Sequence, residues 1–136
     1  MRVEMAWPPN IEAIREVFPI EGHEVFCYGD VIYSPSGIHL PTELLAHEAV
    51  HARQQAAHPG GVKGWWAEYL IDPPFRLEQE LEAHAEEYRT FCRHVKDRNQ
   101  RARMLHRISC RLASPQYKLR ISPIWIATEI RKRALA

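Results

Sequence analysis

The stretch HEAVH, residues 47–51, limits what this chain can form more than any other part of its sequence. Strong helix formers flank it on both sides, with a proline and a glutamate suited to a first helical turn before it and the breaker Pro-Gly-Gly at residues 59–61 after it. The motif is therefore expected inside a helix. Because residues four apart share one helix face, His47 and His51 can direct two imidazoles to a single point.

Two imidazoles at this spacing suit a metal ion, and Glu48 lies beside them, where its carboxylate can accept a proton from water. The motif thus predicts two metal ligands and a general base. H-E-x-x-H also arises by chance in a chain rich in histidine and glutamate, and the alternative is a pair of ordinary half-buried histidines. The helical context favours the metal site.

A catalytic zinc ion needs three protein ligands, so the two histidines alone are an incomplete site. The extension H-x-x-G-x-x-H, which supplies a third histidine in one large class, is absent: Gln54 stands three residues after the motif, and the next histidine, His58, comes too early. A glutamate on a second helix is the other common solution. Three glutamates lie at a workable distance along the chain: Glu78, Glu80 and Glu82.

Several segments together resemble the gluzincins, zinc metallopeptidases in which H-E-x-x-H on one helix is completed by a glutamate on a following helix. These segments are LLAHEAVHARQQ at 44–55, the group Trp65, Trp66 and Tyr69, and QELEAHAEEY at 79–88. Among gluzincins the chain resembles the small minimal-gluzincin proteins of phages and bacteria, and SPQYKLRIS at 114–122 resembles a recurring segment of these. The resemblance covers roughly residues 30–90.

The resemblance implies a zincin-like fold and one catalytic Zn²⁺ held by His47, His51 and Glu80, since residues 80–84 fit the gluzincin frame E-x-x-A-[DHY]. It implies hydrolysis of peptide bonds by a metal-activated water, with Glu48 as the general base. His84 replaces the aspartate of many gluzincins, and would hydrogen-bond near the metal or take the place of Glu80 as a ligand.

Two further expectations concern the same site. Candidate donors that support the metal or stabilise the oxyanion are His84, Tyr88 and Tyr69. The rival to a peptidase is a catalytically inactive, metal-binding zincin-fold protein with a structural or regulatory role.

The length of 136 residues fits one domain, residues 1–136, expected as a mainly helical α+β fold. Residues 1–40 are predicted to form a short helix capped by Asn10 and a β-hairpin with strands at 25–28 and 31–33, followed by a further extended stretch at 38–40. The free edge of the hairpin could pair with an extended peptide substrate.

The remaining segments are predicted to be helical. Residues 41–98 hold the metal-site helices, including an aromatic one over 61–72 and a long amphipathic one from Phe75. Residues 99–136 form basic helices, the first of which begins after a break or cap at Asn99 and the last after Ser122-Pro123.

The net charge of +1 hides an asymmetry along the chain. Residues 1–88 contain five Lys or Arg against fifteen Asp or Glu, whereas residues 89–136 contain thirteen against two. Attraction between the two halves is favoured over the alternative, a nucleic-acid surface along α-helical arginines. That alternative stripe comprises Arg89, Arg93, Arg98, Arg101, Arg103, Arg107 and Arg111.

Composition sets the remaining bounds. The apolar runs are too short to cross a bilayer, and the first residues lack the apolar core of a signal peptide, so a cytoplasmic protein without membrane partners is expected; non-Sec export and a phage particle stay open. The three cysteines are widely spaced and indicate neither a disulfide framework nor a thiolate zinc site. Substrate specificity and oligomeric state are not encoded in any recognisable pattern.

Overall fold

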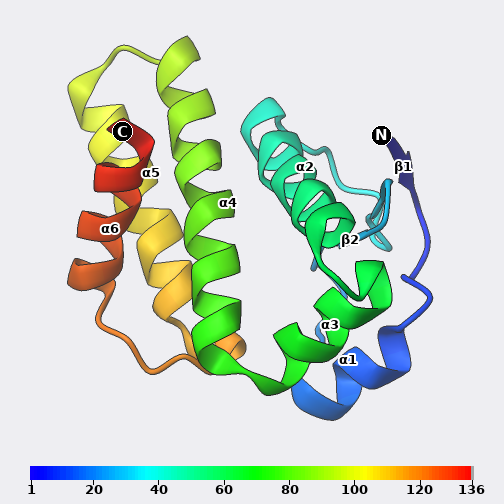
Figure 1. Cartoon of the computed structure of the whole chain (residues 1–136). Coiled ribbons are helices and arrows are strands. Elements are labelled where there is room, and N and C mark those ends of the chain that lie inside the picture. The colour runs from blue at the N-terminus through cyan, green and yellow to red at the C-terminus, as the bar shows by residue number, and fades with distance from the viewer. Residues whose placement is uncertain (136) are drawn as a thin grey trace.

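A computed structural model describes residues 1–135. These residues form six α-helices, one short 3-10 helix and a three-stranded sheet, which confirms the expected mainly helical α+β class (Figure 1). The strands are β1 (Arg2–Glu4), β2 (Phe26–Tyr28) and β3 (Val31–Tyr33). The helices are α1 (Ile11–Val17), α2 (Thr42–Ala57), α3 (Gly61–Ile71), α4 (Pro73–His94), α5 (Arg98–Ala113), η1 (Pro115–Tyr117) and α6 (Pro123–Leu135).

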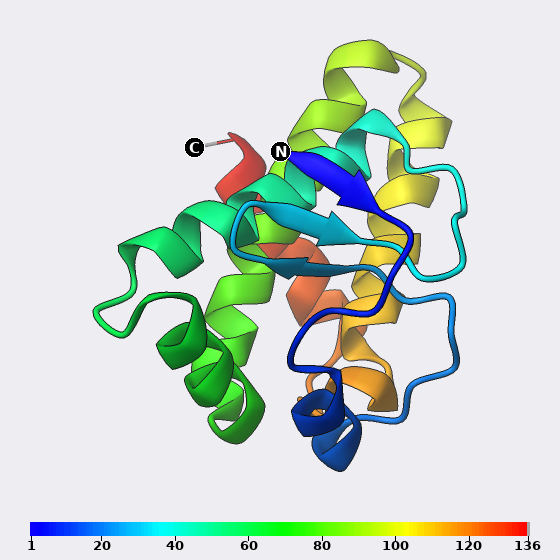
Figure 2. The same ribbon diagram turned by 90° about the vertical axis from the view of Figure 1, so that its right-hand side faces the viewer.

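The small sheet has the strand order β1-β3-β2, and β2 lies against α2 (Figure 2). The predicted hairpin is confirmed: β2 and β3 are antiparallel and joined at Gly29-Asp30, where the φ of +65° at Gly29 suits the absence of a Cβ. β1 was not expected, because a three-residue strand that pairs in parallel with β3 depends on contacts distant in sequence. The extended stretch expected at 38–40 is not part of the sheet.

Of two helix starts predicted with a capping asparagine, one is correct and the other is wrong. α1 begins at Ile11, directly after Asn10 as predicted, but the side chain of Asn10 makes no capping hydrogen bond, and both of its polar atoms are buried without a partner among the described residues. α5 begins at Arg98 rather than after Asn99, because the carboxylate of Asp97 accepts the N–H groups of Asn99 and Gln100. Aspartate in the residue before a helix satisfies donors that the helix itself leaves open.

The long helix α4 begins two residues earlier than predicted, at Pro73 rather than Phe75. Proline suits a first helical turn because that turn has no use for its missing N–H. The side chain of Asp72 caps the helix by accepting the N–H of Phe75 at 3.4 Å. The Pro-Pro pair therefore starts a helix instead of only ending the one before it.

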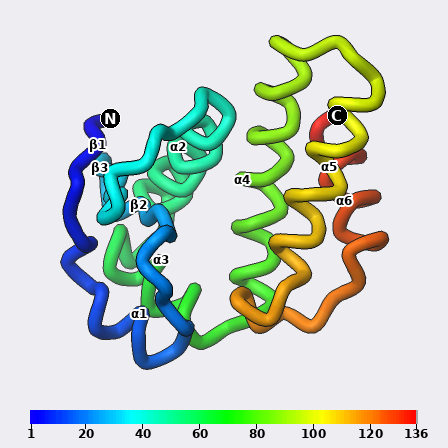
Figure 3. The backbone as a smooth tube through the Cα atoms, turned by 180° about the vertical axis from the view of Figure 1, so that it is seen from behind, coloured from blue at the N-terminus to red at the C-terminus, as the bar shows by residue number. Residues whose placement is uncertain are grey.

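Two apolar cores lie on either side of the interface between α2 and α4. The first joins α1, β2 and α3 and contains Ile14, Phe18, Phe26, Trp65, Trp66 and Tyr69. The second joins α4, α5 and α6 and contains Leu81, Met104, Ile108, Leu112, Ile126 and Ile130. Seen from behind, α4, α5 and α6 form one group, and α2 stands with the sheet, α1 and α3 in the other (Figure 3). The helices α2 and α4 are packed against each other, so polar side chains between them lie between two apolar regions.

None of the helices within residues 1–135 combines the length and the apolar character that crossing a bilayer requires.

Candidate metal centre

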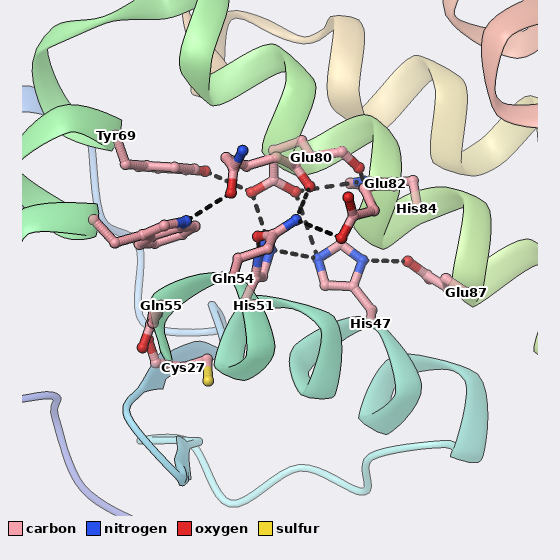
Figure 4. A network of polar contacts seen from close by, with 12 residues as sticks. Cys27, His47, His51, Gln54, Gln55, Tyr69, Glu80, Glu82, His84 and Glu87 are labelled. Atoms are coloured by element: carbon pink, nitrogen blue, oxygen red, sulfur yellow. Dashed lines mark hydrogen bonds and ion pairs between the residues drawn. The ribbon is translucent and has the colours of Figure 1, made fainter. Parts of the chain in front are cut away.

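The two helices α2 and α4 bring His47, His51 and Glu80 together (Figure 4). The Nε2 atoms of the two histidines are 3.1 Å apart. The carboxylate of Glu80 approaches both, with Oε1 3.5 Å from Nε2 of His47 and Oε2 3.3 Å from Nε2 of His51. All three residues are at most 5% exposed. The two residues of the motif and the distant glutamate thus form one buried cluster.

The outer nitrogen of each imidazole has an acceptor that identifies it as the protonated one. Nδ1 of His47 lies 2.9 Å from the carboxylate of Glu87, which is an acceptor when ionised. Nδ1 of His51 lies 2.8 Å from Oε1 of Gln54. The amide nitrogen of Gln54 donates to the main-chain carbonyl of Gln79 and approaches the carboxylate of Glu82, which fixes the orientation of the amide.

Because both Nδ1 atoms donate outwards, both Nε2 atoms turn a lone pair inwards, towards each other and towards a carboxylate. Such a group of electron pairs requires a cation, either a proton or a metal ion. Although burial alone lowers the pKa of His47, the adjacent carboxylates of Glu80 and Glu87 raise it to about 10. Binding of a positive charge, either a proton or a metal ion, is therefore strongly favoured in the cluster.

The spacing of the two Nε2 atoms and the two carboxylate oxygens of Glu80 also fits a metal ion. In a tetrahedral zinc site with bonds of about 2.0–2.1 Å, ligand atoms lie about 3.3 Å apart. The observed separations of 3.1, 3.3 and 3.5 Å match that value. Oε1 of Glu80 is buried and has no hydrogen-bond partner among the described residues, which leaves a lone pair for a ligand bond.

Glu80 is the one of the three candidate glutamates that reaches the histidines. The hydroxyl of Tyr69 donates to its Oε2 at 2.6 Å, so Tyr69 orients this carboxylate. Although burial raises the pKa of Glu80, the imidazoles of His51 and His47 hold it well below its usual range. Glu78 instead pairs with Arg133, and Glu82 lies against Gln54.

His84, one helical turn after Glu80, extends the cluster. Polar atoms of His47, Glu80 and His84 all lie within 4.8 Å of one another, and this buried group could hold a metal ion. Nδ1 of His84, however, lies 2.8 Å from the main-chain carbonyl of Glu80 and so carries the proton, while its buried Nε2 has no partner among residues 1–135. Burial lowers the pKa of His84 to about 4, which makes its ring neutral near pH 7.

Glu87 was not identified from the sequence, although its spacing from Glu80 could have indicated it. It stands seven residues, about two helical turns, after Glu80 and therefore on the same face of α4. It joins His47 to Arg111 of α5, whose guanidinium donates to both of its oxygens at 3.0 and 3.1 Å. Although burial opposes it, the hydrogen bond with His47 lowers the pKa of Glu87 to about 2, so this carboxylate is ionised.

A cavity of about 100 Å³ opens beside the cluster. One wall is aromatic, with Phe18, Phe26, Trp65, Trp66 and Tyr69, and the polar end holds His47, Glu48, His51 and Glu80. The volume has room for more than one water molecule. Burial raises the pKa of Glu48, and the carboxylates of Glu80 and Glu87 add to this effect. Glu48 is thus placed beside the cluster with a raised proton affinity.

The proposed oxyanion donors differ in position. Tyr69 lines the cavity but already donates to Glu80, and Tyr88 lines a different hollow, beyond the cavity. Tyr117 of η1, which was not singled out from the sequence, does line the cavity. Arg76 holds it there by donating to the main-chain carbonyl of Tyr117 at 3.0 Å. Burial raises the pKa of Tyr117, so its hydroxyl keeps its proton.

The hairpin edge is less open to a peptide than expected. β2 is the outer strand, but the carbonyl of Cys27 in its middle accepts hydrogen bonds from Gln55 at 2.9 Å and Trp66 at 3.1 Å. The N–H of Gly29 donates to the same glutamine. An extended chain therefore cannot pair with β2 over its whole length.

Comparisons with family models, with curated proteins and with solved structures found no match for this chain. The function consequently has to be inferred from the geometry of the centre.

Proposed function

We propose that this protein is a zinc-dependent metallopeptidase with a zincin-like, gluzincin-type centre. The observation that carries the proposal is the pair of inward-facing Nε2 atoms of His47 and His51, 3.1 Å apart and capped by the carboxylate of Glu80. Nitrogen and carboxylate ligands of this kind are those that Zn²⁺ takes in catalytic sites with two histidines and one glutamate.

In this proposal the ion is held by His47, His51 and Glu80, and when bound it acidifies water and polarises a carbonyl group. Glu48 accepts the proton of the attacking water and passes it to the leaving amine. Its burial supports this role, because a raised pKa brings a carboxyl group closer to the pH at which it must both take up and release a proton.

Tyr117 is the donor for the oxyanion in the proposed reaction. Tyr117 lines the cavity and its hydroxyl is protonated, whereas the hydroxyl of Tyr69 already donates a hydrogen bond to Glu80. A donor aimed at developing negative charge stabilises the transition state more than the ground state. The aromatic wall of the cavity favours peptides with an apolar side chain next to the cleaved bond.

The metal content of purified protein tests the ligand set. Elemental analysis of the wild type should give one zinc ion per chain, and His47→Ala and Glu80→Ala should lose it. Glu78→Ala, a change of the same type on an exposed part of α4, is the matched control and should retain zinc. Equal zinc in all four proteins would disprove the site.

Activity is tested separately with Glu48→Gln, which should keep its zinc and lose peptide hydrolysis by about 10²-fold or more. Glu43→Gln, on the same helix but outside the cavity, is the control. A Glu48→Gln protein that cleaves casein as fast as the wild type would refute the assignment of the base.

One observation favours a second function, a metal-binding protein without peptidase activity. His47, Glu48, His51 and Glu80 are all at most 5% exposed, which restricts access for a peptide. In that case the wild type would contain zinc, hydrolyse no peptide in a broad substrate library, and be unaffected in stability and metal content by Glu48→Gln.

A further inference from the structure

A second hollow lies between the end of α4, the beginning of α5 and the end of α6, and shares no lining residue with the cavity at the metal centre. Six cationic side chains line it: Arg89, Arg93, Lys96, Arg98, Arg101 and Arg131. Its lining includes no aspartate or glutamate from residues 1–135. We call it the basic groove.

Most of the charge in the basic groove is not neutralised. Arg89 pairs with Glu86, and Arg93 is 3.8 Å from the same carboxylate. Arg101 donates to the main-chain carbonyls of Cys92 and Val95, which satisfies its hydrogen bonds but leaves its charge. The three remaining cations are exposed and form no ion pair with the described residues. They are Lys96, Arg98 and Arg131.

Helix stability explains only part of this arrangement. Cations at the end of a helix are favourable for its dipole, which accounts for Arg93 in the last turn of α4. Arg101 donates to carbonyls at the end of α4 and so also stabilises that helix. Arg98, in contrast, is the first residue of α5, where positive charge opposes the dipole. The presence of Arg98 on the wall of a hollow that already contains five other cations indicates an anionic ligand.

The groove continues along the seam between α5 and α6. A neighbouring hollow there shares Leu105, His106, Ala127, Arg131 and Leu135 with it and extends to Lys132. The result is a longer depression lined by aliphatic side chains and by cations, with Arg131 and Lys132 extending the positive charge along α6. Such a shape suits a linear polyanion rather than a single small anion.

The type of cation favours phosphate over carboxylate polymers or a membrane. Five of the six cations in the basic groove are arginines, whose planar guanidinium forms paired hydrogen bonds with phosphate oxygens. The cations come from three helices and from the loop between α4 and α5, and they line one hollow, whereas an anionic membrane would be met by a flat face. Few aromatic rings are present to stack bases, so contacts to the backbone should dominate.

We propose that the basic groove binds the sugar–phosphate backbone of nucleic acid without sequence preference. Only part of the stripe of seven arginines that was considered from the sequence lines the basic groove. Arg111 pairs with Glu87 at the metal centre, and Arg103 and Arg107 do not line the groove. This proposal is independent of the metal centre.

Fluorescence anisotropy with a labelled DNA duplex of random sequence, and separately with a single strand, tests the proposal on the full-length protein. Binding should weaken steeply as salt rises, by a log–log slope of about −0.9 per phosphate neutralised in duplex DNA. The combined variant Lys96→Glu, Arg98→Glu and Arg131→Glu should bind at least about tenfold more weakly at low salt. Binding of either form of DNA supports the proposal.

The matched control carries the same change of charge on the other half of the chain. It combines Arg15→Glu, Arg53→Glu and Lys63→Glu, three exposed positions outside the basic groove, and should retain most of the affinity. If the groove variant fails to fold by circular dichroism, the milder Gln substitutions at the same three positions replace it. They should make the salt slope shallower by about 0.9 for each phosphate that the variant no longer neutralises.

Three results would overturn the proposal: no DNA binding by the wild type, equal losses of affinity in the groove and control variants, or equal displacement of DNA by polyglutamate or by phosphatidylserine vesicles at matched charge. Glu80→Ala should bind DNA as the wild type does. Failure of the metal-centre proposal and failure of this one are thus distinguishable.

Discussion

His47 has the most informative surroundings of any side chain in this protein. One of its ring nitrogens faces Glu87 and the other faces His51 and Glu80, all within 3.5 Å. A carboxylate behind a histidine fixes its tautomer and increases the electron density that it offers a metal. The role of Glu87 is therefore to position His47.

Replacing Glu87 with Gln should weaken zinc binding by about 10- to 100-fold, because the partner of His47 loses its charge. Competition with a chromogenic chelator measures this affinity. The neighbouring change Glu86→Gln, which lies outside the cluster, should leave the affinity unchanged. Equal affinity of Glu87→Gln and the wild type would contradict the positioning role.

Replacing Tyr117 with Phe should lower kcat by about 10²- to 10³-fold with little change in zinc content, since it removes one donor to the oxyanion. The steady-state rate on a fluorogenic peptide and elemental analysis give the two readouts. Tyr69→Phe, which frees an oxygen of Glu80, should instead affect metal affinity. A loss of zinc in Tyr117→Phe would show that its role is structural.

Among the helices, α4 serves both the site and the core. Glu80, His84 and Glu87 recur at intervals of four and three on its face towards α2, and Leu81 is fully buried against α5 and α6. Periodicity of this kind is visible in the sequence, so the existence of the helix was predictable. Which helix packs against α4 was not predictable, because two amphipathic faces of similar composition can pack in more than one way.

The start of α5 provides a test of the capping assignment. Asp97→Ala should reduce the free energy of unfolding by about 1 kcal/mol, because two N–H groups in the first turn lose their acceptor. Asn99→Ala, at the position expected from the sequence, should have a smaller effect. Urea denaturation followed by circular dichroism measures both changes, and the opposite order would contradict the cap.

For the molecule as a whole, the metal centre connects two groups of elements with separate cores. His47 and His51 belong to the side with the sheet, and Glu80 belongs to the side with α5 and α6. An ion bound between them would add a link across the interface of α2 and α4. Without it, the buried Glu80 must be balanced by protonated imidazoles alone.

Removal of the metal should therefore lower the melting temperature. A ligand at a free concentration of a thousand times its Kd stabilises a folded protein by about 4 kcal/mol. Differential scanning fluorimetry before and after dialysis against a chelator measures the shift, and added Zn²⁺ should reverse it. Glu80→Ala should not respond to either treatment; an equal response would place the bound metal elsewhere.

The HEAVH motif, the helical flanks and the β-hairpin were predictable, since each depends on residues close together in the chain. The selection of Glu80 over Glu78 and Glu82 could be inferred from resemblance, and the structure places Glu80 against the two histidines. Two features could not be obtained in this way. They are the strand β1 and the arrangement of Tyr117 at the cavity.

What the sequence by itself determined was the local part of this protein: which segments are helical, which face of α2 carries two imidazoles, and where the charge of the chain changes sign. Only the tertiary structure decided which groups meet. Arg76 joins α4 to Tyr117, and Glu87 joins His47 to Arg111 of α5. Periodicity depends on neighbours along the chain, whereas these contacts depend on how whole helices pack, and the same periodicity is compatible with several packings.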